Sequence, residues 1–153
     1  MMKQQKDYIE LLSNELKLLE NSVATFVASC EKCKKIGLKK DYNFEELESF
    51  DSLTSKFART SDIFTQKILK TIFFILRENT ITFIDKVNLA EKLCLITSAD
   101  DLIEIRDLRN LIAHEYIPEN IIGLFQDIFN LSESLLKSIE MTKTYCLSFF
   151  SEK

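Results

Sequence analysis

Residues 4–35, QQKDYIELLSNELKLLENSVATFVASCEKCKK, decide the fold class of this chain. Their apolar side chains recur at steps of three and four residues: Tyr8, Leu12, Leu16, Leu19, Val23, Phe26, Cys30 and Cys33. This spacing predicts one long amphipathic helix with a single buried face. Gly37 follows the segment, at a place where glycine commonly ends a helix.

Two further helices are expected in the middle of the chain. Residues 38–49 are polar, so we expect an irregular connection there, followed by a second helix at about residues 50–78. Residues 68–76 are apolar nearly all round, which predicts a central place for this part of the second helix. A third, shorter helix is expected at about residues 82–95.

Capping signals mark the last two helices. Ser98 with Asp101 three residues later approximates a capping box, which predicts the start of a fourth helix that ends near Tyr116. Pro118 suits the first turn of a fifth helix. The apolar stripe expected on this fifth helix is Leu124, Ile128, Leu131, Leu135, Ile139, Cys146 and Phe149.

The composition agrees with an all-α protein. Two glycines and one proline are too few for a turn-rich β-fold. Long helices with short joints favour an antiparallel up-and-down bundle of four main helices plus one short helix. The chain has 153 residues, which suits one domain, so we expect residues 1–153 to form a single helical-bundle domain.

The bulk charge and the hydropathy exclude some classes of protein. The net charge of -4 gives no overall signal of nucleic-acid binding, but it does not exclude a local basic groove. The polar start of the sequence predicts no signal peptide. The longest apolar run, residues 72–76, is far shorter than the ~20 residues of a membrane span. We expect a soluble, cytoplasmic protein with reduced cysteines.

Cys30 and Cys33 form a CxxC pair inside the apolar stripe of the first helix. A structural zinc site would need a second pair at matching spacing, and the sequence has none. We therefore interpret these cysteines as core residues and expect no metal or other cofactor.

Residues 109–116, RNLIAHEY, hold the only histidine of the chain. On a helix, Arg109 and Tyr116 fall at the edge of the apolar face, and Asn110 and His114 fall on the neighbouring flank. An arginine at such an edge is costly unless its guanidinium is paired or faces water. Arg109 therefore either meets an acid within the bundle or lines an interface groove.

Spacing alone leaves several alternatives open for this segment. Asp62 could pair with a motif arginine, and the histidine could be an ordinary surface residue. Arg109 and His114 lie roughly 140° apart on an ideal helix, so a straight helix does not point both at one atom. Either the backbone turns near Ile117, which precedes a proline, or a twofold partner brings a second copy of the motif opposite the first.

A basic stripe is expected on the second helix: Lys56, Arg59, Lys67, Lys70 and Arg77. Its ordinary interpretation is a solvated face. The functional alternative is a phosphate track for RNA, with salt-sensitive binding. Under that alternative, Lys67, Lys70 and Arg106 of the fourth helix are the candidate RNA-binding residues.

The segment DLRNLIAHEY, residues 107–116, resembles the signature of the HEPN superfamily. Arg109, four residues, His114, one residue and Tyr116 resemble the tighter form found in the HepT-like branch. The segments FARTSDIFTQKILKTIF and TFIDKVNLAEKLCLI are also similar to that branch, so the resemblance spans roughly residues 5–145.

The resemblance implies a helical bundle that forms a homodimer, with the motif helices facing each other across the twofold axis. It implies a metal-independent endoribonuclease, acting on RNA rather than DNA, that serves as a toxin paired with a nucleotidyltransferase antitoxin. Tyr116 is then the residue that receives AMP from that partner.

The residue chemistry is compatible with this expectation, since RNA carries its own nucleophile in the 2′-hydroxyl. His114 would be the general acid or base, Arg109 would stabilise charge on the phosphate, and Asn110 would orient the phosphate or the histidine. One histidine per chain cannot be both acid and base, but a dimer supplies two. The alternative is a non-catalytic adaptor or substrate subunit of a nucleotidyltransferase.

Overall fold

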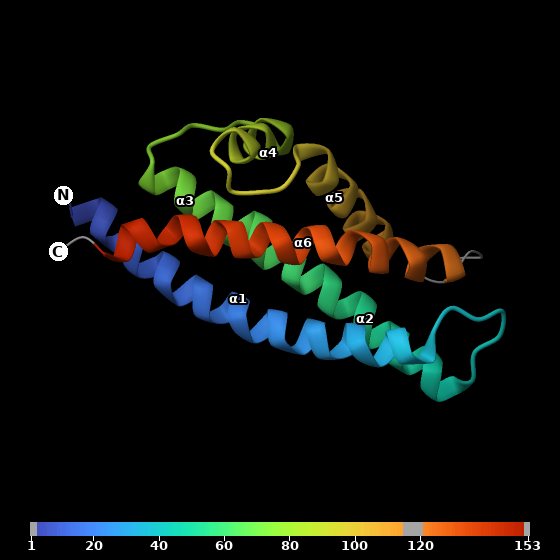
Figure 1. Cartoon of the computed structure of the whole chain (residues 1–153). Helices are drawn as coiled ribbons and strands as arrows, with labels where there is room; N and C mark the ends of the chain where they lie inside the picture. The colour runs from blue at the N-terminus through green and yellow to red at the C-terminus, as the bar shows by residue number, and fades with distance from the viewer. Residues whose placement is uncertain (1–2, 115–120, 152–153) are drawn as a thin grey trace.

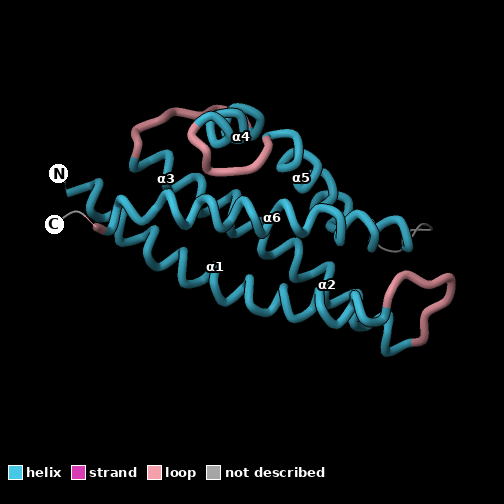
Figure 2. Tube along the Cα trace, viewed as in Figure 1, coloured by secondary structure: helices cyan, strands magenta, loops and turns pink. Residues whose placement is uncertain are grey.

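The computed structural model describes residues 3–114 and 121–151. Helices make up most of these residues and none of them forms a strand, so the predicted all-α class is confirmed (Figure 2). The helices follow in the order α1 (Lys3–Ile36), α2 (Phe44–Asp62), the π-helix η1 (Ile63–Ile68), α3 (Leu69–Ile75), α4 (Phe83–Lys92), α5 (Ala99–His114) and α6 (Ile121–Phe150).

The helices form the predicted antiparallel bundle (Figure 1). α2, η1 and α3 follow one another without a break and act as one long rod beside α1. α6 runs back along the bundle, so the two ends of the chain lie at the same end of the molecule. The short α4 is seen nearly end-on and lies over α3, crosswise to the long helices.

The predicted apolar stripes form the core. On α1, Leu12, Leu19 and Phe26 are fully buried, as are the two cysteines of the stripe or nearly so, and its remaining members are partly buried against the core. The central part of the second rod is buried at Ile68 and Ile72, as its all-round apolar sequence predicts.

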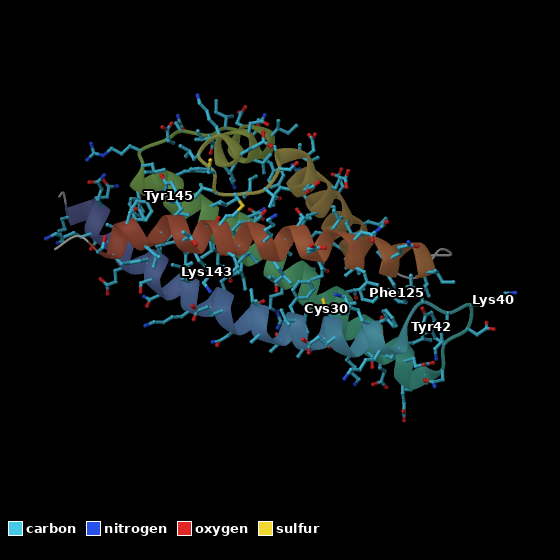
Figure 3. All side chains as sticks on the ribbon, in the orientation of Figure 1. Cys30, Lys40, Tyr42, Phe125, Lys143 and Tyr145 are labelled. Carbon is cyan, nitrogen blue, oxygen red and sulfur yellow. The ribbon has the colours of Figure 1, made fainter. Side chains whose placement is uncertain are left out.

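Aromatic rings close the end of the bundle near the connection between α1 and α2. Phe50 of α2 stacks on Phe125 of α6, with ring centroids 4.0 Å apart. Tyr42 packs edge-on against Phe125, and both lie together at this end of the molecule (Figure 3). This cluster fixes α6 against α2.

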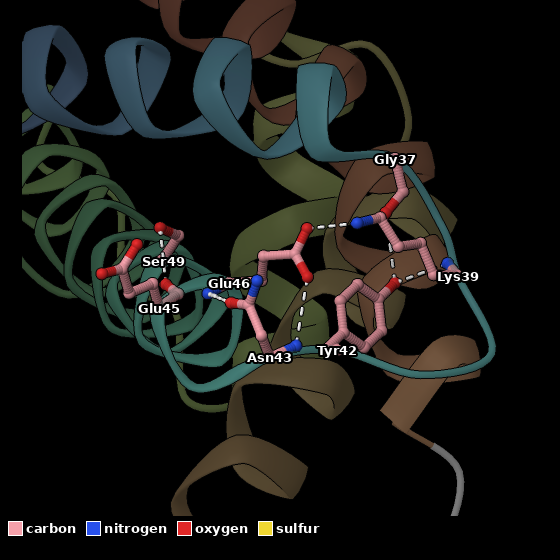
Figure 4. A network of polar contacts seen from close by, with 7 residues as sticks. All are labelled: Gly37, Lys39, Tyr42, Asn43, Glu45, Glu46 and Ser49. Carbon is pink, nitrogen blue, oxygen red and sulfur yellow. Dashed lines mark hydrogen bonds and ion pairs between the residues drawn. The ribbon is translucent and has the colours of Figure 1, made fainter.

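The prediction of an irregular stretch over residues 38–49 is wrong for its second half, because α2 begins at Phe44. Asn43 is the N-cap: its side chain accepts from the Glu46 amide at 2.8 Å, and the Glu46 carboxylate accepts from the Asn43 amide at 3.1 Å (Figure 4). This capping box satisfies amides that the polar sequence would otherwise leave to water.

Two helices end earlier than predicted. After α3, Arg77 adopts a φ of 57° and its amide bonds to the Phe74 carbonyl, which stops the helix. Cys94 does the same after α4 with a φ of 62° and an amide bond to the Glu91 carbonyl. Both are left-handed C-caps in positions that glycine usually takes. Gly37, with a φ of 79°, ends α1 as predicted.

The predicted start of the fourth helix is confirmed. The Ser98 hydroxyl accepts from the Asp101 amide at 3.2 Å, and α5 begins at Ala99. Two further predictions concern Tyr116 at the end of this helix and Pro118 at the start of the next. Both positions lie outside the described residues.

Candidate functional site

Arg109 of α5 forms a two-pronged ion pair with Asp62, the last residue of α2. Its Nε donates to Oδ1 and its Nη2 donates to Oδ2, each at 2.8 Å. The pair is partly covered, and the carboxylate raises the pKa of the guanidinium mainly through these hydrogen bonds. Of the two alternatives for Arg109, the structure therefore shows the ion pair with an acidic residue, and that residue is Asp62.

The ion pair lies where the second rod changes its winding. Asp62 precedes the π-helix Ile63–Ile68, and the Leu69 amide bonds to the Phe64 carbonyl five residues earlier. A π-helical turn inside an α-helix is rare, and it is frequently found at functional sites. The sequence carries no signal for it, since residues 63–68 have the same apolar spacing as an ordinary helix.

A shallow groove of about 840 Å³ runs beside this ion pair, between α2, η1 and α5. Asn110 and Lys67 line the groove together with Arg109 and Asp62. Arg59 adds a further cation to its wall. Three of the predicted site residues, Arg109, Asn110 and Lys67, are thus brought together on one surface.

His114 is not brought to this groove within one chain. α5 continues as an α-helix through His114, which is exposed on its last turn. Because residues 109–114 are all α-helical, the side chains of Arg109 and His114 still point in directions roughly 140° apart around the helix axis. The turn expected near Ile117 and the predicted AMP acceptor, Tyr116, lie outside the described residues.

The other two predicted RNA-binding residues, Arg106 and Lys70, line a second cavity of about 470 Å³ between α3, α4 and α5. The two hollows share Gln66 and Asn110, so they adjoin across these side chains. Lys86 of α4 also lines the second cavity. Helical spacing does not predict the place of Lys86, because only the contact of α4 with η1 brings it near the other cations.

The chain matches no protein family, no curated protein and no solved structure. The resemblance of its motif to the HepT-like branch therefore rests on the sequence segments that carry it.

The CxxC pair is part of the core, as predicted. Cys30 and Cys33 are buried, and burial raises the pKa of the Cys33 thiol to about 11. Cys33 donates to the Ser49 carbonyl, which ties α1 to α2. Within residues 3–114 and 121–151, no three metal-binding side chains gather at one point.

The helices described here give no sign of a membrane segment: none combines the length and the apolar character that a span requires.

Proposed function

We propose that this protein is a metal-independent endoribonuclease of the HEPN type. It acts as a homodimeric, cytoplasmic toxin that a nucleotidyltransferase partner controls. The observation that carries the proposal is the fixed orientation of Arg109, which Asp62 holds at the wall of a groove that also contains Asn110 and Lys67. An arginine held in place costs less entropy when it meets a phosphate than one that must first be ordered.

The reaction uses the 2′-hydroxyl of the RNA itself. Its oxygen attacks the adjacent phosphorus and loses its proton to one histidine. The new bond joins the 2′-oxygen to phosphorus, and the bond from phosphorus to the 5′-oxygen breaks. The leaving 5′-oxygen takes a proton from the second histidine, which gives a 2′,3′-cyclic phosphate and a 5′-hydroxyl. The reaction written in this way uses no metal ion.

Arg109 stabilises the negative charge that develops on the phosphate oxygens. The two hydrogen bonds to Asp62 use Nε and Nη2, so the Nη1 amino group stays available for a phosphate oxygen. Asn110 directly follows Arg109 on α5 and orients the phosphate or the histidine. The RNA backbone binds along the two adjoining hollows, where its phosphates contact the cationic side chains of Lys67, Lys70 and Arg106.

The dimer supplies the second histidine. Apolar side chains near the end of α5 and the start of α6 support self-association, because Leu111 is 43% exposed and Ile122 is 37% exposed. A twofold axis through this region brings the two copies of His114 towards each other. Tyr116 follows His114 by two residues, so an AMP group on it adds charge and bulk where RNA enters.

The experiment compares RNA cleavage in EDTA by the wild-type protein, by His114→Ala and by Glu104→Ala, an exposed control on the same helix. Cleavage by the wild type and by Glu104→Ala, with none by His114→Ala, is the expected result. Circular dichroism and gel filtration of each variant show that fold and dimer persist. Equal cleavage by His114→Ala removes the catalytic role.

The second candidate function is that of a non-catalytic subunit of a nucleotidyltransferase. The completed ion pair favours it, since a guanidinium held by a carboxylate through two bonds also serves purely as a link between α5 and α2. A stable complex with the nucleotidyltransferase that does not need Tyr116, together with no cleavage of RNA, distinguishes this function from the first.

A further inference from the structure

Three cationic side chains from three different helices meet around the cavity between α3, α4 and α5. They are Lys70 of α3, Lys86 of α4 and Arg106 of α5. Segments far apart in the sequence therefore contribute to one concave, positively charged surface. Such a surface, built by tertiary packing, differs from a row of lysines along one exposed helix.

Neighbouring groups hold each cation in place. The Arg106 guanidinium lies over the Phe83 ring, 4.6 Å from the ring centroid, which fixes the plane of its donors. The Lys70 ammonium lies 5.8 Å from the Phe74 ring centroid. The half-buried Lys86 donates to the Thr65 carbonyl of the π-helix at 3.3 Å.

The three cations outnumber the carboxylates of this cavity, since Glu78 is the one acidic side chain among the described residues that line it. Among the residues that the structure describes, no carboxylate forms an ion pair with Lys70, Lys86 or Arg106. The nearby Asp85 carboxylate accepts from the Thr82 amide as part of a helix cap. Burial lowers the pKa of Lys86, and the charges of Lys70 and Arg106 lower it further.

Placing two further cations, Lys70 and Arg106, around the half-covered amine of Lys86 is unfavourable until an anion enters. A tetrahedral anion with several acceptor oxygens suits this arrangement, because ammonium and guanidinium donors from different directions bind separate oxygens. Gln66 and Asn110 offer amide donors at the edge where the cavity adjoins the Arg109 groove.

We propose that Lys70, Lys86 and Arg106 form a binding site for a phosphate group, carried either by a free nucleotide or by single-stranded RNA. Lys86 is the central ligand, since it extends from α4 into the cavity and its ammonium group is held by the Thr65 carbonyl of the π-helix. The site goes beyond the proposed ribonuclease chemistry, because it binds phosphate whether or not the chain cleaves RNA.

The test measures binding of three probes to the full chain: inorganic phosphate, AMP and a labelled single-stranded oligonucleotide with 2′-deoxyribose. The deoxy oligonucleotide cannot be cut through a 2′-hydroxyl, so a failed ribonuclease does not affect this measurement. The variants are Lys86→Met and Lys70→Met. Lys17→Met is the matched control, because Lys17 is an exposed lysine on α1 and is not part of the cavity.

We expect Lys86→Met to weaken binding by about tenfold, as for the loss of one charge-assisted hydrogen bond, whereas Lys17→Met binds like the wild type. For the oligonucleotide, the slope of log affinity against log salt falls in magnitude by about 0.7, as for one lost phosphate contact on a single strand. Lys70→Met lowers affinity in the same direction.

The probes also identify the source of the phosphate. Binding of AMP and inorganic phosphate supports a site for a free nucleotide, and binding of the oligonucleotide alone supports a subsite for RNA. The proposal is overturned if no probe binds, or if Lys86→Met and Lys17→Met bind every probe with equal affinity.

Discussion

Arg109 and Asp62 are joined by two hydrogen bonds of 2.8 Å, and this pair connects α5 to the point where the second rod becomes π-helical. The link crosses 47 positions of sequence. It sets the orientation of the Arg109 guanidinium, and it holds α5 against α2 along one side of the groove. The ion pair is therefore a structural contact between two helices, and under the proposed function it also orients Arg109 for a phosphate group.

The contribution of this pair to stability is measurable with a double-mutant cycle of Asp62→Ala, Arg109→Ala and the double variant. Because the side chains are 38% and 30% exposed, we expect a coupling energy of only about 1 kcal/mol. Each single variant then melts about 2–4 °C below the wild type. Asp51→Ala, an exposed acid on α2, serves as the control and should melt like the wild type. A coupling near zero would show that the two bonds do not hold α5 in place.

Lys86 opposes folding at neutral pH. Its pKa in the folded state lies below the ordinary value of 10.5, so the folded protein binds this proton less tightly than the unfolded chain does. This destabilisation of the folded state is fully present below the folded-state pKa of Lys86, and it disappears as the pH rises above 10.5. We expect Lys86→Met to raise the melting temperature at pH 7, and the difference from the wild type to narrow towards pH 10.5.

The control for this prediction is Lys92→Met, which removes an exposed lysine from the last turn of α4. Lys92 lies where a positive charge favours the helix dipole, so its loss should not raise the melting temperature. A lower melting temperature for Lys86→Met would mean that the bond to the Thr65 carbonyl outweighs the burial of the charge.

The four cysteines should differ sharply in reactivity. Cys94 is exposed, whereas Cys30, Cys33 and Cys146 are buried, and burial raises the pKa of Cys146 to about 12. Since the thiolate is the reactive form, a chromogenic disulfide reagent at neutral pH should modify one thiol per folded chain, and the other three only in denaturant.

Cys94→Gly tests the assignment of that single thiol. The substitution should abolish the fast reaction without loss of stability, because Cys94 adopts a φ of 62°, where glycine carries no steric penalty. Rapid modification of a second thiol in the folded wild type would show that the core around α1 or α6 opens readily.

Periodicity was sufficient to predict the helical architecture. The stripe from Leu12 to Cys33 became the buried face of α1, because a long amphipathic pattern has few alternative packings. The start of α2 at Phe44 was missed because its first turns are polar, and the signal was the cap formed by Asn43 and Glu46. The left-handed ends at Arg77 and Cys94 carry no glycine, so no local signal marked them.

The candidate site was predictable only where neighbours in sequence stay neighbours in space. Arg109 and Asn110 share one groove because they share one helix. The choice of Asp62 as the partner of Arg109 depends on how α5 packs against α2, and the place of Lys86 depends on how α4 crosses η1. Both follow from tertiary contacts that helical spacing does not encode.

The central claim is that two chains build one ribonuclease site, and subunit mixing tests it most directly. Wild-type protein is exchanged with increasing fractions of His114→Ala at constant total concentration, and RNA cleavage in EDTA is measured. If one histidine serves as the base and the partner's as the acid, mixed dimers are inactive and the rate falls as the square of the wild-type fraction. A rate that falls in direct proportion to that fraction, or a wild-type protein that cleaves no RNA, would contradict the account.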